Sequence, residues 1–308
     1  EESILLYEKA VELDPTFLDP WFGLAIDYMS IGNLEKSNEA LRNLLEEKAI
    51  NDEVIDYNYN VISLLDRNAI LITNGDNDTY PAWILTKILN YRPDVRIVNR
   101  SLLNTEWYPI HLIRNEGIPE FIDERSLTSF RENILEYIKS NKIDMPAVGP
   151  FSDALLSEII SSSNENEIPL YFAATLYQTK IIREVKREGL DFGLVARIGN
   201  TDKSYAEQIR TQIRIWLNEF RTGGLDSWQL RHGKRNDSGK FFALNYGASI
   251  ELLIDPVKKY APDYLLPLFY WYKDHILELL SENNASKINE TWCKIENVKE
   301  IRDWCQNR

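Results

Sequence analysis

A short acidic turn, "NGDNDTY" at residues 74–80, carries the side chains best suited to chemistry. Its candidate ligand-binding residues are Asp76, Asn77, Asp78 and Thr79. Oxygens of this kind hold Mg²⁺ or Ca²⁺, and one Asp could also act as a nucleophile or a general base. The turn follows an apolar, β-branched run at 69–73, which predicts a strand, and open α/β sheets bind ligands at the carboxyl ends of their strands.

Helix capping is a second interpretation of the same turn. Asp78 or Thr79 ahead of Pro81 is a favourable N-cap, and Pro is favoured in the first helical turn. An acidic side chain there also suits the helix dipole. Capping accounts less well for Asp76 and Asn77, so capping, ligand binding and catalysis all remain open.

A second polar group follows the next predicted strand, at 95–99. Its candidate ligand-binding residues are Asn99, Arg100, Asn104, Glu106 and Tyr108. Side chains that follow neighbouring parallel strands could line one crevice with the acidic turn. Alternatively, Ser101 and Thr105 cap short helices, and Trp107 and Tyr108 pack inside the fold.

No complete catalytic set accompanies these residues. The acidic turn lacks both Gly-x-Gly-x-x-Gly and a Lys after the glycine, so it matches neither a dinucleotide-binding fingerprint nor a phosphate-binding loop. The three histidines, His111, His232 and His275, stand far apart and outside known hydrolase motifs. A divalent cation at the acidic turn is the one cofactor that the sequence suggests, and whether the chain is an enzyme stays open.

Charge and composition exclude several classes of partner. The 308 residues are 44% hydrophobic and 27% charged, as in a folded protein, and carry a formal charge of −13. This balance argues against nucleic acid, whose phosphates are bound by Lys and Arg. The one basic cluster, at 231–240, is expected to be a solvated loop. No apolar run reaches the ~18 residues that a membrane span needs.

The two cysteines, Cys293 and Cys305, are predicted to lie on one helix. Twelve residues of helix would separate them by about 18 Å, which exceeds the ~7 Å between Cα atoms that a disulfide permits. We therefore expect no disulfide, and the absence of a nearby His or Cys pair argues against zinc.

The element that precedes the acidic turn is a helical repeat. The spacing of the tetratricopeptide signature is found at Trp21, Leu24, Ala25, Tyr28, Gly32 and Leu41. Tyr7, Ala10 and Pro15 repeat this phase 34 residues earlier, so the chain is expected to begin inside a repeat, with more repeats upstream. Such arrays bind a protein or peptide partner in a groove.

From residue 66 the pattern alternates strands and helices. Strands are predicted at 69–73, 95–99, 168–175 and 191–199, and the "DMPAV" at 144–148 predicts another strand-to-helix turn. This alternation predicts an α/β fold, a Rossmann-like, mostly parallel sheet with helices on both faces. We expect tetratricopeptide helices at 1–65, the α/β domain at 66–202 and a mainly helical region at 203–308.

Four motifs resemble the soluble C-terminal region of a large membrane-protein family. They read "NAILITNGDNDTYPAWIL", "RPDVRIVNRSLLNTEWY", "IPLYFAAT" and "EGLDFGLVARIG", and span roughly 68–200. That family is abundant in Bacteroidetes, is related to eukaryotic protein O-mannosyltransferases, and joins a multi-pass glycosyltransferase-like membrane domain to a soluble region. The resemblance implies a shared α/β module and association with the cell envelope. Because the membrane domain is absent here, it does not imply mannosyl transfer.

Two functions are consistent with the sequence. The first is a non-catalytic interaction or scaffold protein that combines a tetratricopeptide groove with an α/β module of unknown ligand. The second is an enzyme, a transferase or hydrolase, that binds a sugar or a metal-chelated phosphate compound at the Gly75–Thr79 turn. The sequence itself leaves the compartment open.

Overall fold

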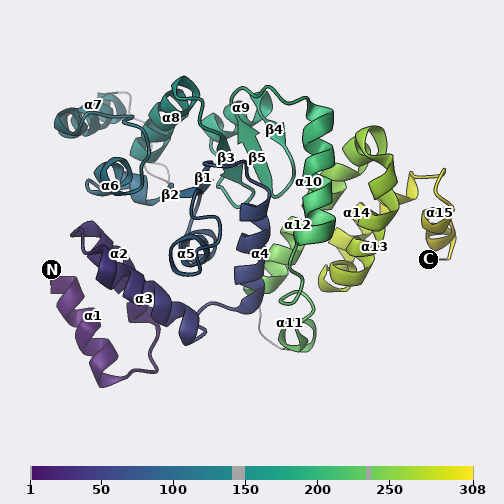
Figure 1. Cartoon of the computed structure of the whole chain (residues 1–308), viewed down its shortest axis with the longest axis horizontal. Coiled ribbons are helices and arrows are strands. Elements are labelled where there is room, and N and C mark those ends of the chain that lie inside the picture. The colour runs from purple at the N-terminus through teal and green to yellow at the C-terminus, as the bar shows by residue number, and fades with distance from the viewer. Residues whose placement is uncertain (1, 141–149, 234–236, 308) are drawn as a thin grey trace. The chain divides into compact units, whose positions relative to one another are not determined.

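The structure, a computed structural model, describes residues 2–140, 150–233 and 237–307 (Figure 1). Each of its two compact units is assembled from separate stretches of the chain. Unit 1 comprises Glu1–Ile50, Asp66–Tyr171 and Leu176–Glu184, and unit 2 comprises Asn51–Leu65, Phe172–Thr175 and Val185–Arg308. The strand-to-helix turn predicted at 144–148 and residues 234–236 of the basic cluster lie outside the described residues.

Unit 1 begins with helical hairpins. Their helices are α1 (Glu2–Leu13), α2 (Asp19–Ser30) and α3 (Leu34–Glu46). Gly32 turns the chain between α2 and α3 at a φ of 76°, a conformation that glycine adopts without strain. Small residues bring the helices together: the Tyr7 ring lies against Gly23, and the Ser37 hydroxyl donates to the Ala25 carbonyl at 2.7 Å. The hairpins predicted from the spacing are therefore present.

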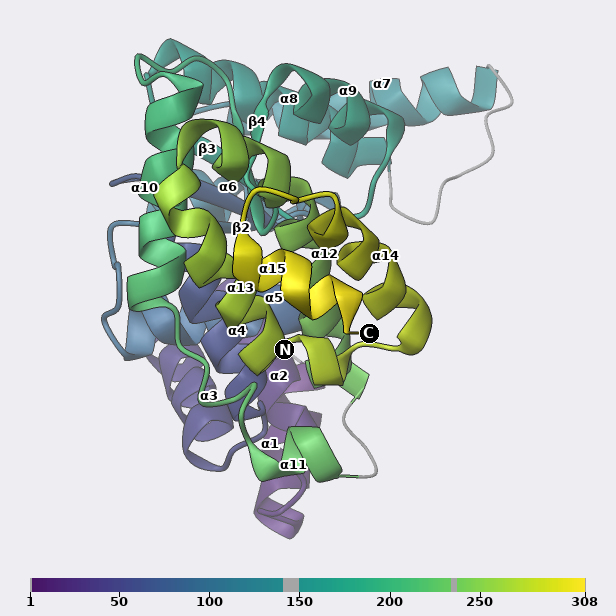
Figure 2. The same ribbon diagram turned by 90° about the vertical axis from the view of Figure 1, so that its right-hand side faces the viewer.

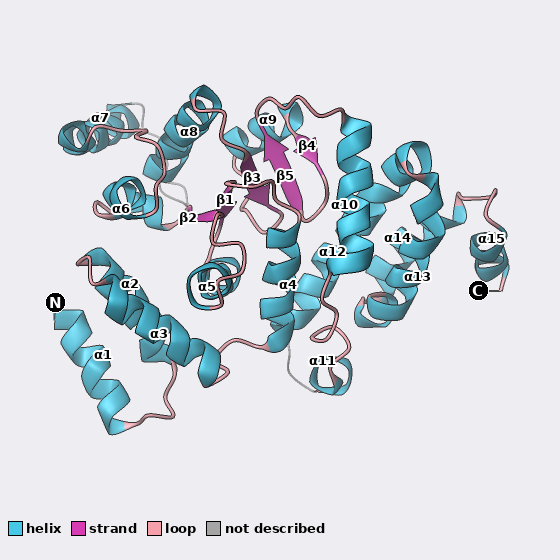
Figure 3. Ribbon diagram, viewed as in Figure 1, coloured by secondary structure: helices cyan, strands magenta, loops and turns pink. Residues whose placement is uncertain are grey.

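Five short strands form one mixed sheet, drawn in magenta in Figure 3. They are β1 (Ile70–Thr73), β2 (Arg96–Asn99), β3 (Leu170–Ala173), β4 (Leu190–Asp191) and β5 (Val195–Ile198), in the order β2-β1-β3-β5-β4. β1 and β2 pair in parallel, from Ile70 opposite Arg96 to Thr73 opposite Asn99. All residues of β1, β3 and β5 are buried, as the mainly apolar runs of these strands predict.

The prediction of a single strand at 191–199 is wrong, and the sheet is only partly parallel. The chain reverses after Asp191, so that β4 and β5 form an antiparallel pair. Gly193 adopts a φ of 86°, and its N–H donates to the Asp191 carboxylate at 2.9 Å. This tight turn splits an apolar run that otherwise reads as one strand.

The remaining helices of unit 1 follow the strands. They are α5 (Asp76–Trp83), the π-helical turn η1 (Ile84–Ile88), the 3₁₀ turns η2 (Leu102–Asn104) and η3 (Glu124–Ser126), α6 (Tyr108–Asn115), α7 (Leu127–Ser140), α8 (Pro150–Glu165) and the first half of α9 (Lys180–Glu188). Pro81 lies inside α5, where it lacks an N–H to donate, and the helix widens into η1 directly afterwards.

Unit 2 is mainly helical. Its helices are α4 (Asp52–Ser63), α10 (Tyr205–Glu219), α11 (Trp228–His232), α12 (Asp237–Tyr260), η4 (Pro262–Tyr264), α13 (Leu265–His275), η5 (Leu277–Leu279), α14 (Glu282–Cys293) and α15 (Lys299–Gln306). Helix α4 packs against α10 and α12. The buried Asn60 side chain fixes this packing, because it donates to the Tyr246 hydroxyl and accepts from the Arg221 N–H, both at 2.7 Å.

The two cysteines form a disulfide, so the prediction that they lie too far apart on one helix is wrong. Helix α14 ends at Cys293, the chain turns at 294–298, and Cys305 lies on the separate helix α15 with 5.7 Å between the two Cα atoms. Figure 2 shows α15, in yellow, beside α14 and α13. Closing a loop of this length is expected to stabilise the folded state by about 3 kcal/mol.

Across the described residues, none of the helices combines the length and the apolar character that crossing a membrane requires.

Candidate functional site

The acidic turn caps helix α5 through Asp78. The helix starts at Asp76 with Gly75 as its N-cap, so neither Asp78 nor Thr79 occupies the N-cap position expected from the sequence. Instead, the buried Asp78 carboxylate reaches back and accepts from the N–H groups of Asn74 and Gly75, each at 2.8 Å. Asp76 and Asn77 are exposed. Of the two carboxylates of the acidic turn, that of Asp78 is therefore held by backbone N–H groups of the turn.

Thr79 and Asn99 bind each other beneath the turn. The Thr79 hydroxyl lies 2.7 Å from the Thr73 hydroxyl and accepts from the Asn99 side-chain amide at 3.0 Å. The Asn99 side-chain carbonyl accepts from the Leu102 N–H at 3.0 Å. All three polar side chains are buried, so these bonds join the carboxyl ends of β1 and β2.

Tyr108 packs at the start of α6 and is fully engaged. Its hydroxyl accepts from the Asn99 N–H at 2.9 Å, and its ring stacks on His111. Burial raises the pKa of Tyr108 well above its ordinary value, so the phenol stays neutral. A neutral hydrogen-bonded phenol in the core stabilises the fold and does not suit acid–base chemistry near neutral pH.

A buried ionic group lies next to Tyr108. His111 Nε2 is 3.0 Å from the Glu116 carboxylate, which also pairs with Lys87. Burial raises the pKa of Glu116, but the hydrogen bond with His111 and the charge of Lys87 outweigh it and lower the pKa to about 2. His111 is therefore held by a carboxylate inside the fold.

Arg100 is fully buried and joins three segments. Its guanidinium pairs with Asp153 at the start of α8 and donates to the Tyr177 carbonyl at 3.4 Å. Nearby, the Asn104 side chain donates to the Ser101 carbonyl at 3.1 Å and accepts from the Ser152 N–H at 3.2 Å. These polar groups therefore hold the segments after β2 and β3 and the start of α8 in place.

We call Asp78, Thr79, Asn99, Arg100, Asn104 and Tyr108 the strand-end cluster. Hydrogen bonds join three of them, Thr79, Asn99 and Tyr108. Arg100 and Asn104 each bind the start of α8. Asp78 binds the N–H groups of its own turn. Among the described residues, no group of three or more His, Cys, Asp or Glu side chains is arranged to hold a metal ion.

Glu106, unlike the other predicted residues, lines a hollow. A cavity of about 490 Å³ lies between the α2–α3 turn and α6. Its walls include Met29, Ile31, Glu106, Trp107, Ile110 and Arg114. Ile31, at the turn, is 53% exposed. The sequence did not single out Met29, Ile31 or Ile110 in these walls, and no spacing rule connects Ile31 with Ile110.

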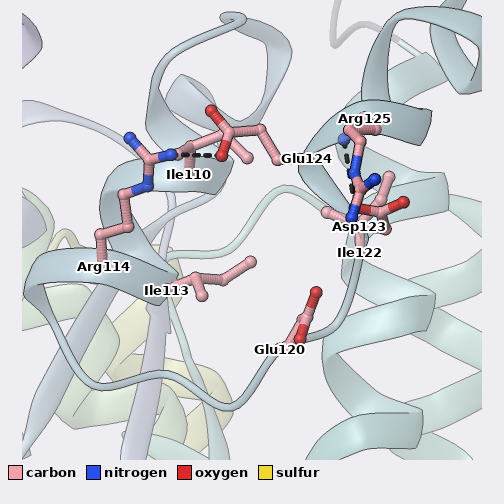
Figure 4. Close-up of a pocket in the computed structure, with 8 residues that line it drawn as sticks. All are labelled: Ile110, Ile113, Arg114, Glu120, Ile122, Asp123, Glu124 and Arg125. Atoms are coloured by element: carbon pink, nitrogen blue, oxygen red, sulfur yellow. Dashed lines mark hydrogen bonds and ion pairs between the residues drawn. The ribbon is translucent and has the colours of Figure 1, made fainter.

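A second hollow, of about 280 Å³, adjoins the first, and Figure 4 shows the residues that line it. The two share Ile110, Arg114 and Glu124 in their walls. In Figure 4 Arg114 and Glu124 form an ion pair, Asp123 and Arg125 lie together, and Glu120 stands apart from both pairs. We call the joined hollows, lined from 29–32, 106–115 and 120–125, the α6 groove.

The part of the chain that contains the acidic turn and α6 matches a known family. Residues 54–117 match the family described as TMEM260-associated domain 2. TMEM260 is a membrane protein related to O-mannosyltransferases. The match covers most of α4 together with β1, α5, β2 and α6, and it overlaps the span of resemblance to that family at residues 68–117. No curated protein and no solved structure matches the chain.

Proposed function

We propose that this chain is a non-catalytic interaction module that binds a peptide or protein segment in the α6 groove. The hairpins would then be tetratricopeptide-type repeats, and the sheet a Rossmann-like support that positions α6. The observation that carries the proposal is the groove itself, a concave surface lined by both aliphatic and charged side chains. Ligand sites have this composition, with apolar walls and a few polar groups that select the ligand.

The packing of the hairpins favours the α6 groove over the face of α2 as the binding surface. The Phe22 ring packs edge-on against the Tyr80 ring, with 4.9 Å between centroids. The Tyr80 hydroxyl donates to the Phe22 carbonyl at 2.9 Å. Helix α5 therefore covers this side of α2, whereas the α2–α3 turn remains accessible beside α6.

The alternative, an enzyme that uses the Gly75–Thr79 turn, has less support. A cation there would compete with two backbone N–H groups for the Asp78 carboxylate, and it would have to recruit that carboxylate from inside the fold. Thr79 and Asn99 are likewise committed to each other. Removing any of these groups would first disturb the fold, so they are poorly placed to change partners during a reaction.

Selection from a random peptide display library tests the proposed function. We expect immobilised protein to enrich a set of peptides, and the Ile31→Asn variant to bind that set at least about tenfold more weakly, because the change replaces an apolar contact with a polar amide and adds no charge. Leu13→Asn is the matched control, since Leu13 is an exposed aliphatic residue of the same unit outside the groove.

Circular dichroism of both variants checks that each is folded. Failure to enrich any peptide, or equal binding of the enriched set by wild type and Ile31→Asn, would overturn the proposal.

A further inference from the structure

We infer that the α6 groove selects a cationic segment: an extended stretch of a partner that places Lys or Arg side chains beside an aliphatic one. This inference rests on the proposed function and adds the chemistry of the occupant. Three features of the groove carry it: uncompensated carboxylates, partly exposed isoleucines and an indole ring.

The walls of the groove carry more acidic than basic side chains. They hold four carboxylates and two guanidinium groups, a net of two negative charges: Glu106, Glu120, Asp123 and Glu124 against Arg114 and Arg125. The occupant would therefore enter a field that favours cations, and the formal charge of −13 on the whole chain adds to it at low salt.

The excess charge resides on two identifiable residues. Arg114 is paired with Glu124, and the Arg125 guanidinium lies 4.0 Å from Asp123. Asp123 also accepts from the Arg125 N–H and the Ser126 hydroxyl at the start of η3, so its carboxylate is engaged. Over the described residues, the carboxylates of Glu106 and Glu120 make no hydrogen bond or ion pair. These two carboxylates are therefore available to bind a ligand.

Glu106 and Glu120 line different hollows, and this separation determines which conformation a bound segment must adopt. Glu106 lines the first hollow and Glu120 the second, with Ile110 shared between them. A segment fits these positions when it places one cationic side chain in each hollow and an aliphatic side chain over Ile110. An extended strand presents alternate side chains on one face, so it suits two such positions better than a single compact cation.

The aliphatic walls suit Lys and Arg as well as an aliphatic anchor. Ile110, Ile113 and Ile122 are partly exposed along the second hollow. The long methylene stems of Lys and Arg pack on such surfaces while their charged ends reach a carboxylate. Trp107 lines the first hollow, and an indole ring attracts a cation through its face. An acidic segment would meet repulsion at both carboxylates.

Three fluorescein-labelled nonapeptides test the inference by anisotropy. Each has a central Leu in an Ala/Gly background, flanked at alternate positions by two Lys, two Gln or two Glu. At low ionic strength the Lys peptide is expected to bind about tenfold more tightly than the Gln peptide, and the Glu peptide more weakly still. Raising the salt to 0.5 M should remove most of the Lys preference.

Paired variants locate the charge selection. Glu106→Gln with Glu120→Gln is expected to reduce the Lys-over-Gln preference to about twofold or less. Glu12→Gln with Glu184→Gln is the matched control, because it removes the same charge from two paired, exposed glutamates of unit 1 outside the groove. A Lys preference that survives in the groove variant, or falls equally in the control, would overturn the inference.

The outcomes separate this inference from the proposed function. If all three peptides bind alike and Ile31→Asn weakens each of them, the groove binds segments but does not select charge. If Ile31→Asn leaves every affinity unchanged, or no peptide binds, both the cationic selection and the groove as a binding site for such segments are overturned.

Discussion

The strand-end cluster and the α6 groove are both polar regions of unit 1, yet their side chains are used in opposite ways. In the cluster, Asp78, Asn99 and Arg100 are buried, and each makes hydrogen bonds or ion pairs to other parts of the fold. In the groove, Glu106 and Glu120 are exposed, and no described residue pairs with their carboxylates. Polar residues that follow strands can therefore be structural, while those left unpaired beside an apolar wall are the better candidates for binding.

The physical reason for this difference is desolvation. A polar group removed from water must find a partner inside the protein, or it destabilises the folded state by ~1–3 kcal/mol. Parallel strands end close together, so their loops bring polar groups into a crowded edge where they satisfy one another. We therefore expect substitutions in the cluster to change stability first, and substitutions in the groove to change binding first.

The largest effect is expected for Asp153→Asn. This change leaves the fully buried Arg100 guanidinium without its counter-ion, and should lower the free energy of unfolding by about 3 kcal/mol. Urea denaturation of the purified variant measures it. Asp76→Asn is the control at the same edge, where the exposed side chain should contribute less than about 1 kcal/mol. A larger loss for Asp76→Asn than for Asp153→Asn would contradict the assignment of structural roles.

The ionic group around Glu116 should make stability depend on acid pH. Its folded-state pKa of about 2 lies below the ordinary value of 4.5, so its contribution is complete above pH 4.5 and is lost as the pH falls towards 2. In Glu116→Gln the free energy of unfolding should fall by about 2 kcal/mol at pH 7, with a shallower decline between pH 4.5 and 2.5. Parallel slopes for variant and wild type would rule out this role.

A smaller loss is expected for Asp78→Ala. The change removes the two hydrogen bonds that hold the start of α5, which should lower the free energy of unfolding by about 1 kcal/mol. Asp78→Ser, which retains an oxygen in reach of the backbone, should recover part of that loss. If instead Asp78→Ala is as stable as wild type and gains or loses binding of a ligand, the turn would be a site and not a cap.

The smallest effect on stability is expected for the groove. Glu106→Gln and Glu120→Gln should each change the free energy of unfolding by less than about 0.5 kcal/mol, because neither carboxylate has a described partner to lose. Thermal unfolding of both variants beside wild type measures this. A loss above 1 kcal/mol would show that the two glutamates serve the fold, and would remove the contrast between the regions.

Periodicity and propensity predicted the elements of the fold well. The first three predicted strands coincide with β1, β2 and β3 to within a residue or two, because their buried β-branched runs are bounded by turn residues. The hairpins at the start followed from Leu24, Ala25 and Gly32, whose sizes are dictated by close helix packing. Both signals are local in sequence, which is why they could be read without a structure.

The features that the sequence did not predict depend on contacts between distant residues or on single turns. The β4–β5 turn rests on the one residue Gly193, and the disulfide rests on a chain reversal at 294–298 inside a helical pattern. The α6 groove joins Ile31 to Ile110, which are neighbours only because the hairpin packs beside α6. The sequence shows which polar residues follow the strands, but burial and the hydrogen bonds of each side chain depend on the packing of distant segments.

Hydrogen–deuterium exchange with and without a display-selected peptide tests the central claim most directly. We predict slower exchange on binding at 29–32 and 106–125, which form the α6 groove, and unchanged exchange at 74–79, the acidic turn. Slower exchange at 74–79 with no change along 106–125 would contradict the claim, and would return the binding site to the strand ends.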